Sequence, residues 1–592
     1  MTEATNKAAA PTLRSIGAAG RYRGLVILAL AGLVGIAAGL VVTAMSWIAQ
    51  FLHTLLFGIS SGTRLSAQVA LATPALALVP AAGGLLIALT VLLSRRFRTR
   101  PPVDPIEANA VHGGRMSTRE SLLLAAQTLI SSGFGASVGL EAGYTQLAAS
   151  IGSRLATLSG LRRNEIRTLV GCGAAGAIAA AFGAPLTGAF YGFELIIGVY
   201  SIGLLGPIMV AALTASLVAT LLGAAQTTIH IGVIPQLGAW DALPFILLGI
   251  VGGGAAIAVM RLVVLVERGF AWTRMPPLLR PVIGGLIVGG IALLTPQALS
   301  SGHGALDLQL GSNTALNALG VLFVLKALAS AISLGSGFRG GLFFASLFLG
   351  ALLGKAVALA ITAADLPLHL DPTLAALVGM ASMAVGVVGG PLTMTFLVLE
   401  VTGDLAISVA VLAASIAASV LVRETFGFSF STWRLHLRGE SIRGAHDVGR
   451  LRNLTVGSMM RPDVKTARCG ITIEAFREAY PLGSTERVVV VDDRGRYAGI
   501  VLVADAYARR VGSPEAAELQ INSLLKFPDY VLMPWQSAEQ AAARFEQSHS
   551  EELAVVQSQD NPTVVGLLTE AHLYRRYAEE LDKSRQDLTG ET

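Results

Sequence analysis

The chain has 592 residues, of which 53% are hydrophobic and only 14% are charged, and it contains 66 glycines. This composition excludes an ordinary soluble enzyme and is typical of a protein that crosses a membrane many times. The formal net charge of +5 comes mostly from basic flanks of the apolar part, so nucleic acid is not an expected partner.

The first 23 residues are polar and basic, and we expect 1–23 to be a cytosolic N-terminal segment. It carries Lys7, Arg14, Arg21 and Arg23 and shows no cleavage site after an apolar run, so no removable signal peptide is predicted. Lys and Arg accumulate on the cytoplasmic side of membrane proteins, and further arginines follow the last apolar run. Both termini are therefore expected in the cytoplasm, with the protein in a bacterial inner membrane.

Apolar segments fill residues 24–430, which we expect to form one transmembrane domain. Four stretches are long enough to cross a hydrocarbon core of about 30 Å. These stretches are 25–42, 202–222, 245–263 and 316–334. The run 283–294 and the glycine-rich pieces 171–198 and 341–402 are predicted to be half-helices or tilted segments. Such segments are tolerated at membrane depth only beside protein or a water-filled cavity.

The stretch 133–146, GFGASVGLEAGYTQ, places Glu141 in an apolar, glycine-rich surrounding. An ionised carboxylate is costly there, which makes it a functional candidate. The glycines let backbone N–H groups converge at a helix start, and such a start forms an anion site from amide dipoles. Glu141 is predicted to occupy this site when ionised and to leave it when protonated, as a gate sensitive to pH and voltage. A structural cap or ion pair is the alternative.

A twelve-residue motif occurs in both halves of the apolar part, as GAPLTGAFYGFE at 183–194 and as GGPLTMTFLVLE at 389–400. Six of the twelve positions are identical, and each copy ends on a carboxylate, Glu194 or Glu400. Duplication of this kind is found in transporters whose binding site lies where broken helices of two repeats meet. Because the two glutamates are equivalent, we expect them to be structural rather than carriers of transported protons.

The second half also contains a counterpart of the segment around Glu141. GLFF at 341–344 corresponds to GLEA at 139–142, with Phe343 in the place of Glu141. Two glycine-led helix starts are therefore predicted to point their positive ends at one anion from opposite sides. Ordinary core packing is the alternative for Phe343.

A tail of soluble composition follows a predicted linker at 431–453. Its two halves repeat helix, apolar strand, polar turn and strand, which predicts two small α/β units that pack as a pair. The first unit is predicted at 454–511 and opens with 456–460; the second is predicted at 520–578 and opens with 521–526. Neither the two cysteines nor any other motif has metal-ligand, P-loop or Ser/His/Asp spacing, so neither a metal site nor an enzyme is expected.

Taken in order, these motifs resemble the CLC family of chloride channels and proton/chloride exchangers over nearly the whole chain. The resemblance is carried by 139–146, 173–194, 335–350, 379–404 and the tail, which is similar to a tandem of CBS modules. It implies an all-α polytopic membrane domain of two inverted repeats of tilted and broken helices, followed by a small cytosolic α/β CBS pair. It also implies a homodimer with one pore per subunit, and chloride or another small anion as the substrate.

The resemblance implies a role for particular residues of this chain. Glu141 matches the family's gating glutamate. The implied anion site comprises Gly139, Leu140, Gly341, Leu342, Phe343, Phe344, Phe430 and Pro101.

Two of these positions depart from the family's pattern in the anion site itself. Pro101 falls where the family has an anion-contacting serine, and a proline there goes with nitrate preference in relatives. Phe430 replaces a pore-lining tyrosine and so removes a hydroxyl donor, for which Ser429 or Ser431 is the candidate substitute.

Two further departures bear on coupling and charge. Leu195 stands where exchangers carry an internal proton glutamate, and leucine cannot relay a proton. Arg339 stands where relatives often have proline; it either raises the local anion concentration or extends toward the interface or a carboxylate.

In CBS modules, an Asp that closes the last motif commonly holds a nucleotide ribose, with Ser or Thr three residues earlier. The first unit has Asp505 but Leu502 in the hydroxyl position, and the second has Thr569 but His572 in place of Asp. Adenine nucleotide as a cofactor at Asp505 and Thr569 is therefore the alternative to a regulatory platform that stabilises a dimer.

The sequence thus predicts a CLC-type, voltage- and pH-gated chloride channel with weak or no proton coupling. A proton/chloride or nitrate antiporter is the first alternative, and a non-conducting membrane nucleotide sensor is the second.

Overall fold

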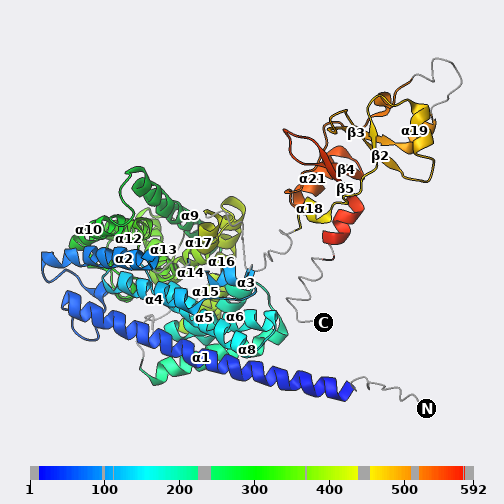
Figure 1. The fold of residues 1–592 in the computed structure, drawn as a ribbon. Coiled ribbons are helices and arrows are strands. Elements are labelled where there is room, and N and C mark those ends of the chain that lie inside the picture. The colour runs from blue at the N-terminus through cyan, green and yellow to red at the C-terminus, as the bar shows by residue number, and fades with distance from the viewer. Residues whose placement is uncertain are drawn as a thin grey trace, which may run out of the picture. The chain divides into compact units, whose positions relative to one another are not determined.

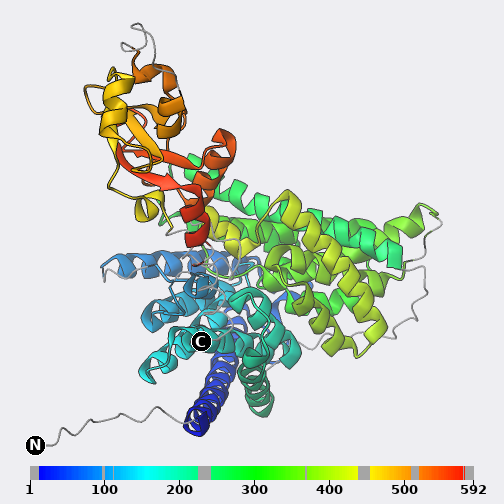
Figure 2. The same cartoon turned by 90° about the vertical axis from the view of Figure 1, so that its right-hand side faces the viewer.

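The computed structural model describes residues 13–96, 101–110, 112–223, 242–366, 368, 370–437, 454–508, 519–577 and 579. The chain divides into two compact units, Met1–Asp447 and Val448–Thr592 (Figures 1 and 2). The first unit is helical and the second is a small α/β unit, as the composition break predicted.

The first unit is built from long apolar helices and short helices between them. Its helices are α1 (Leu13–Phe57), α2 (Val79–Arg96), α3 (Pro105–Ala110), α4 (Thr118–Gly133), α5 (Glu141–Leu158), α6 (Arg163–Phe182), α7 (Pro185–Tyr191), α8 (Ile202–Leu221), α9 (Ala242–Trp272), α10 (Arg280–Leu294), α11 (His303–Gly311), α12 (Leu316–Ser336), α13 (Phe343–Ala363), α14 (Pro372–Val388), α15 (Pro391–Thr402), α16 (Leu405–Thr425) and α17 (Phe430–Leu437). Within the described residues, 8 helices are long and apolar enough to cross a membrane. This unit is an integral membrane domain.

The order of helices repeats in the two halves. The start of α5 at Glu141 corresponds to the start of α13 at Phe343, and the Pro185 start of α7 corresponds to the Pro391 start of α15. Helix α1 packs along α8, as Figure 1 shows, and α9 packs along α16 in the same way. The internal duplication predicted from the two motifs is therefore present in the arrangement of the helices.

The prediction of half-helices is correct in part. Helices α7 and α15 are short, with 7 and 12 residues, but α6 and α13 have 20 and 21 and are long enough to span. The glycines of α6 permit close packing instead of ending the helix. A Cβ on Gly173 would lie 2.3 Å from the carbonyl oxygen of Ala148 on α5, so only glycine allows this contact.

Two predicted boundaries fall within helices. Helix α1 begins at Leu13, inside the predicted N-terminal segment 1–23, and its part that is long and apolar enough to span a membrane is Gly24–Phe57; residues 1–12 lie outside the described residues. The predicted linker 431–453 begins as helix α17, because Phe430 and Leu435 are buried in apolar contacts. Residues 438–453 lie outside the described residues.

The second unit contains two small sheets flanked by helices. Its elements are α18 (Val456–Met459), β1 (Thr466–Arg468), α19 (Ile473–Ala479), β2 (Arg487–Val491), β3 (Tyr497–Leu502), α20 (Val503–Ala508), the 3-10 helix η7 (Ile521–Leu524), α21 (Ala538–Ser548), β4 (Glu552–Val556) and β5 (Val564–Thr569). Strand β1 is parallel to β2, and β2 is antiparallel to β3; β4 and β5 form an antiparallel pair.

The opening segments of the two halves of this unit are exchanged, which differs from the sequence-based division. Val456 and Met459 of α18 pack into the core around α21, β4 and β5. Ile521 of η7 packs into the core around α19, β2 and β3, where Lys526 also bridges Ile500. Each half therefore completes the core of the other.

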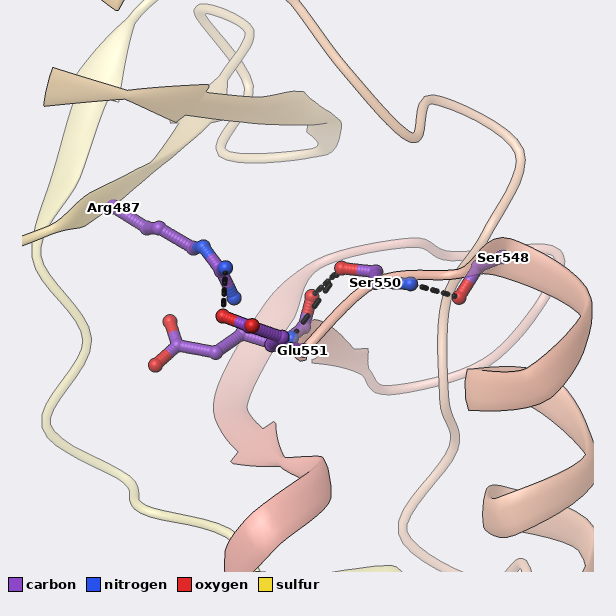
Figure 3. Close-up of polar contacts among 5 residues, drawn as sticks. Arg487, Ser548, Ser550 and Glu551 are labelled. Atoms are coloured by element: carbon purple, nitrogen blue, oxygen red, sulfur yellow. Dashed lines mark hydrogen bonds and ion pairs between the residues drawn. The ribbon is translucent and has the colours of Figure 1, made fainter. Parts of the chain in front are cut away.

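A salt bridge further joins the two halves of the second unit. Arg487 Nη2 of β2 lies 2.6 Å from Glu551 Oε2, just before β4 (Figure 3). The neighbouring Ser550 hydroxyl donates to the carbonyl oxygen of Glu552 at 2.7 Å, which fixes the turn that carries Glu551.

Candidate functional site

The starts of α5 and α13 meet at a backbone bridge. Gly139 N donates to Gly341 O at 3.0 Å, and Gly341 N donates to Gly139 O at 3.3 Å. The first N–H groups of a helix have no acceptor within it, and the helix dipole makes that end positive. The bridge therefore brings two positive helix ends together at one place, as the sequence predicted.

Glu141 is the first residue of α5 and lies beside this bridge. Its side chain is buried, with 4% exposed, and among the described residues its Oε2 has no hydrogen-bond partner. A Cβ on Gly139 would lie 1.7 Å from that oxygen, so the carboxylate rests where only glycine leaves room for it. A carboxylate of this kind is poorly held and sits next to helix ends that attract anions.

Glu141 lines two cavities. The histidine cavity, of about 110 Å³, is lined by His53, Arg64, Ser66, Glu141, Ser300 and His303 among others. The arginine cavity, of about 210 Å³, is lined by Pro101, Glu141, Tyr191, Arg339, Phe343 and Phe430 among others. Glu141 contributes to the wall of both cavities and is the residue that they share.

The structure brings together most of the residues that the sequence assigned to the anion site. Pro101, Gly341, Leu342, Phe343 and Phe430 all line the arginine cavity. Three other assigned residues do not line it. Leu140 lines the histidine cavity, Gly139 forms the backbone bridge, and the ring of Phe344 is fully buried and stacks on His303 at a centroid distance of 3.6 Å.

The hydroxyl groups proposed to substitute for the missing tyrosine lie apart. Ser431 lines the arginine cavity, whereas Ser429 lines a neighbouring cavity and its hydroxyl lies 3.0 Å from that of Thr432.

Tyr191, which was not among the predicted site residues, also lines the arginine cavity and lies within the first copy of the repeated motif. Because the repeated motif was already a candidate for the binding site, the position of Tyr191 within it could have identified this residue from the sequence.

Leu195 and Arg339 also line the arginine cavity. Leu195 presents an apolar side chain there, so no acid stands at this position of the wall. Arg434 lines the same cavity as Arg339, and its guanidinium is placed over the Phe430 ring at 5.8 Å. Asp104 is a carboxylate on the same wall, so the cavity contains both signs of charge.

Glu194 and Glu400 each cap a helix of the opposite repeat. Glu400 accepts hydrogen bonds from Leu186 N and Thr187 N, both at 2.8 Å, and from the Thr187 hydroxyl at 2.6 Å. Glu194 accepts three hydrogen bonds in the same way from Leu392 N, Thr393 N and the Thr393 hydroxyl, at 3.0, 2.8 and 2.6 Å. This geometry agrees with the structural role expected for both.

A buried lysine that the sequence analysis did not single out contacts Ser300, a residue of the histidine cavity. Lys326 of α12 is 0% exposed, and its Nζ donates to Ser300 O at 2.7 Å and to Ala298 O at 3.2 Å. Its signal was visible, because a lysine in the apolar run 316–334 is a functional candidate by the same reasoning as Glu141.

The two halves of the nucleotide pattern in the second unit are engaged in other contacts. Asp505 forms an ion pair of 2.7 Å with Lys526, and the Thr569 hydroxyl accepts a hydrogen bond of 3.2 Å from His572 N. Burial, followed by the nearby arginines 575, 461 and 576, lowers the pKa of His572. Arg575 and Arg576 are paired with Glu579.

Comparison with known proteins agrees with this arrangement. The model of a family described as voltage gated chloride channel matches residues 83–423. A ClcB-like protein of Ralstonia nicotianae is 34% identical over 386 residues, which are 64% of this chain and 89% of that protein. The voltage-gated ClC-type chloride channel ClcB of Salmonella typhimurium is 30% identical over 403 residues, which are 67% of this chain and 95% of that protein.

Solved structures share the fold. A slow cyanobacterial Cl⁻/H⁺ antiporter is similar with a TM-score of 0.57 at 23% identity, covering 70% of this chain and 97% of that one. A eukaryotic CLC transporter is similar with a TM-score of 0.59 at 18% identity, covering 93% of this chain and 98% of that one. With two duplicated halves, helix starts that meet at Glu141 and a family model matched over most of the membrane unit, the chain belongs to the voltage gated chloride channel family.

Proposed function

We propose that this protein is a chloride channel in which Glu141 is the gate. The observation that carries the proposal is that Glu141 forms part of the wall of two cavities, beside the bridge that joins two helix starts. Backbone N–H groups at 342–344 and at the start of α5 supply the attraction for the anion. An ionised Glu141 competes with chloride for these groups, and protonation or displacement of the carboxylate opens the path.

The proposal includes passive conduction with weak or no proton coupling. It is supported by Leu195 on the wall of the arginine cavity, since an aliphatic side chain neither binds nor releases a proton. It is also supported by the name of the Salmonella relative, which is a channel. A proton/chloride antiporter is the competing function, and the cyanobacterial structure of the same fold carries that name.

The orientation follows from the basic N-terminal segment. If residues 1–23 lie in the cytoplasm, α1 crosses the membrane from Gly24 toward Phe57, and His53 lies near the outer end of that helix. The histidine cavity then faces the outside and the arginine cavity the cytoplasm. We place the chain as a homodimer in a bacterial inner membrane with both termini in the cytoplasm.

The reversal potential of purified protein in liposomes tests the proposal. Under a chloride gradient, a channel has its zero-current voltage at the chloride Nernst value and drives no protons uphill. Uphill proton movement coupled to chloride would establish the antiporter instead. Absence of chloride flux in a well-folded preparation that binds ATP or AMP would favour the nucleotide sensor.

A further inference from the structure

Helix α12 carries three buried polar side chains on one face of an otherwise apolar span. Lys326, Ser330 and Ser333 are all 0% exposed, and their spacing of four and then three residues places them on the same side of the helix. An ammonium group and hydroxyl groups are costly at membrane depth unless they have partners. The groups opposite this face therefore indicate what it does.

The two serines of this face hold the segment that leads to Glu141. Ser137 N donates to the Ser333 hydroxyl at 2.9 Å, and the hydroxyl oxygens of Ser137 and Ser330 lie 3.0 Å apart. Ser137 lies four residues before Glu141 in the chain. Helix α12 thus holds the backbone from which the Glu141 side chain projects.

Lys326 holds a strained turn beside the same segment. Its Nζ donates to the carbonyl oxygens of Ser300 and Ala298. Ser300 N donates to Gly135 O at 3.3 Å, and the Ser300 hydroxyl lies 3.2 Å from that of Ser132. The φ of Ser300 is 53°, a left-handed conformation that costs energy in a residue other than glycine. Such a conformation persists only where its surroundings fix it, and Lys326 is one of the groups that fix it.

Lys326 and Glu141 are buried groups of opposite charge. Ser300, which Lys326 contacts, lines the histidine cavity together with Glu141, and a coulombic interaction joins Lys326 to Glu141. The attraction acts on a carboxylate whose Oε2 has no hydrogen-bond partner among the described residues. A nearby positive charge favours the ionised carboxylate over the neutral acid. In the proposed function, the ionised form is the one that closes the path.

Other titratable groups surround Glu141. Tyr144 of α5 and Tyr191 of α7 interact with it, and both are phenols, which are neutral at ordinary pH. The walls of the two cavities add His53, Arg64 and His303 on one side and Asp104, Arg339 and Arg434 on the other. Within the part of the chain that the structure describes, the full charge that interacts with Glu141 is that of Lys326.

The charged residues of the helices packed on α5 lie farther along them. Leu169 of α6 lies against Gly152, which is about three turns from Glu141, and the charged residues of α6 all precede Leu169. Thr128 of α4 lies against Gly143, whereas the charged residues of α4 are in its first turn. These charges therefore act on Glu141 more weakly than Lys326 does.

From this arrangement we propose that Lys326 is a positioning residue of the gate, which keeps the Glu141 carboxylate ionised and in the path while Ser330 and Ser333 hold the backbone that carries it. The inference rests on the proposed function, because Glu141 is the gate only there. Lys326 lines neither cavity, so it acts through Glu141 and not on the anion. A helix of the second repeat thereby controls a side chain of the first.

The pH dependence of chloride flux in liposomes tests this role. Lys326→Gln removes the charge and keeps N–H donors for the carbonyl oxygens of Ala298 and Ser300. Because Glu141 is then protonated more readily, the pH of half-maximal flux is expected to rise by about one unit. Lys326→Arg keeps the charge and is expected to retain the wild-type midpoint. An unchanged midpoint in Lys326→Gln overturns the role of Lys326.

The matched control is Lys355→Gln on α13. Lys355 is also buried, and its Nζ also donates to two backbone carbonyl oxygens, those of Gln309 and Ser312 at the end of α11. It lines neither cavity. We expect the pH of half-maximal flux to stay that of the wild type, and equal shifts for Lys355→Gln and Lys326→Gln contradict the proposal.

Thermal midpoints in detergent test the pairing of Lys326 with Glu141 without any flux. Lys326→Gln leaves a buried carboxylate without its counter-charge and is expected to lower the midpoint. The double variant Glu141→Gln/Lys326→Gln removes both charges and is expected to recover part of this loss. If Lys326→Gln alone fails to fold, a folded double variant supports the pairing as well.

Strictly additive changes of the thermal midpoint, or failure of both the single and the double variant to fold, overturn the pairing. A wild-type protein that does not conduct, together with coupled midpoints, overturns the proposed function and not the pairing. The two failures are therefore distinguishable.

Discussion

The chemistry proposed for this protein depends on one carboxylate and the glycine beside it. Glu141 lies against Gly139, with an oxygen that has no hydrogen-bond partner among the described residues. An unsatisfied buried polar atom is costly, so the carboxylate can leave this position at less cost than a fully bonded one. A gate needs this property, because a side chain held by several bonds would remain in place.

Glu141→Gln removes the ionised form and should therefore flatten the pH dependence of chloride flux. The measurement is chloride efflux from liposomes across a range of pH. Glu424→Gln is the control, because this glutamate is exposed on α16 and its side chain is 67% accessible. A Glu141→Gln protein with the pH dependence of the wild type would remove Glu141 from the gate.

Gly139→Ala should displace the carboxylate, because the new methyl group would lie 1.7 Å from Glu141 Oε2. We expect a several-fold faster chloride flux at high pH, where an ionised Glu141 otherwise closes the path. In a Glu141→Ala background the clash disappears, so adding Gly139→Ala should change the flux little. An equal effect in both backgrounds would show that the methyl group acts elsewhere.

Pro101→Ser should favour chloride over nitrate. A serine hydroxyl donates a hydrogen bond to an anion, worth about 1.5–3 kcal/mol, which proline cannot provide. Pro102→Ser is the matched control, since Pro102 lines the same cavity one residue further along. The measurement is the chloride-to-nitrate ratio of flux, and identical changes in the two variants would mean that position 101 has no special contact with the anion.

At the scale of elements, the two short helices α7 and α15 hold each other. The glutamate at the end of each copy of the repeated motif caps the short helix of the other copy. Phe190 of α7 and Phe396 of α15 stack on each other at a centroid distance of 4.1 Å. Negative groups at a helix start stabilise it through its unpaired N–H groups and its dipole. The two repeats are therefore joined by six hydrogen bonds to two carboxylates.

Glu400→Gln should destabilise the protein. Hydrogen bonds to a charged acceptor contribute about 1.5–3 kcal/mol each, and the amide retains one acceptor oxygen and turns a donor toward N–H groups. We expect the thermal midpoint in detergent to fall by several degrees, measured by loss of the monodisperse peak on size exclusion. Glu267→Gln, an exposed position on α9, should leave the midpoint unchanged. A midpoint equal to that of the wild type would mean that the three bonds to Glu400 contribute little.

At the scale of the whole molecule, the candidate anion path and the α/β unit belong to different compact units. Both cavities and both helix starts lie within Met1–Asp447, and the exchanged opening segments lie within Val448–Thr592. The second unit has its own apolar cores.

Truncation after Leu437 should therefore preserve chloride flux in liposomes. The whole set of residues that line the two cavities ends before that point. The control is the full chain at the same protein-to-lipid ratio. A truncated protein that is monodisperse but does not conduct would show that the second unit is needed to open the path.

The sequence alone determined the class of the protein, the duplication and the gate candidate. Hydropathy, the spacing of glycines and a charged residue in an apolar run are properties of neighbouring residues, so they can be read without the fold. They predicted the meeting of the starts of α5 and α13, because equivalent motifs lead each helix. They also predicted that Glu194 and Glu400 are structural, although not which helices they cap.

Only the tertiary structure decided which residues share a cavity. His53, Arg64, His303 and Lys326 are far apart in the chain, and nothing in their local sequence relates them to one another. The full length of α6, the Ser66 contacts with α11 and the exchange of 456–460 with 521–526 likewise depend on contacts between distant segments. The hydrophobic pattern allows many different pairings of helices and segments. Close packing of their side chains selects one of these pairings, and it cannot be read from the local sequence.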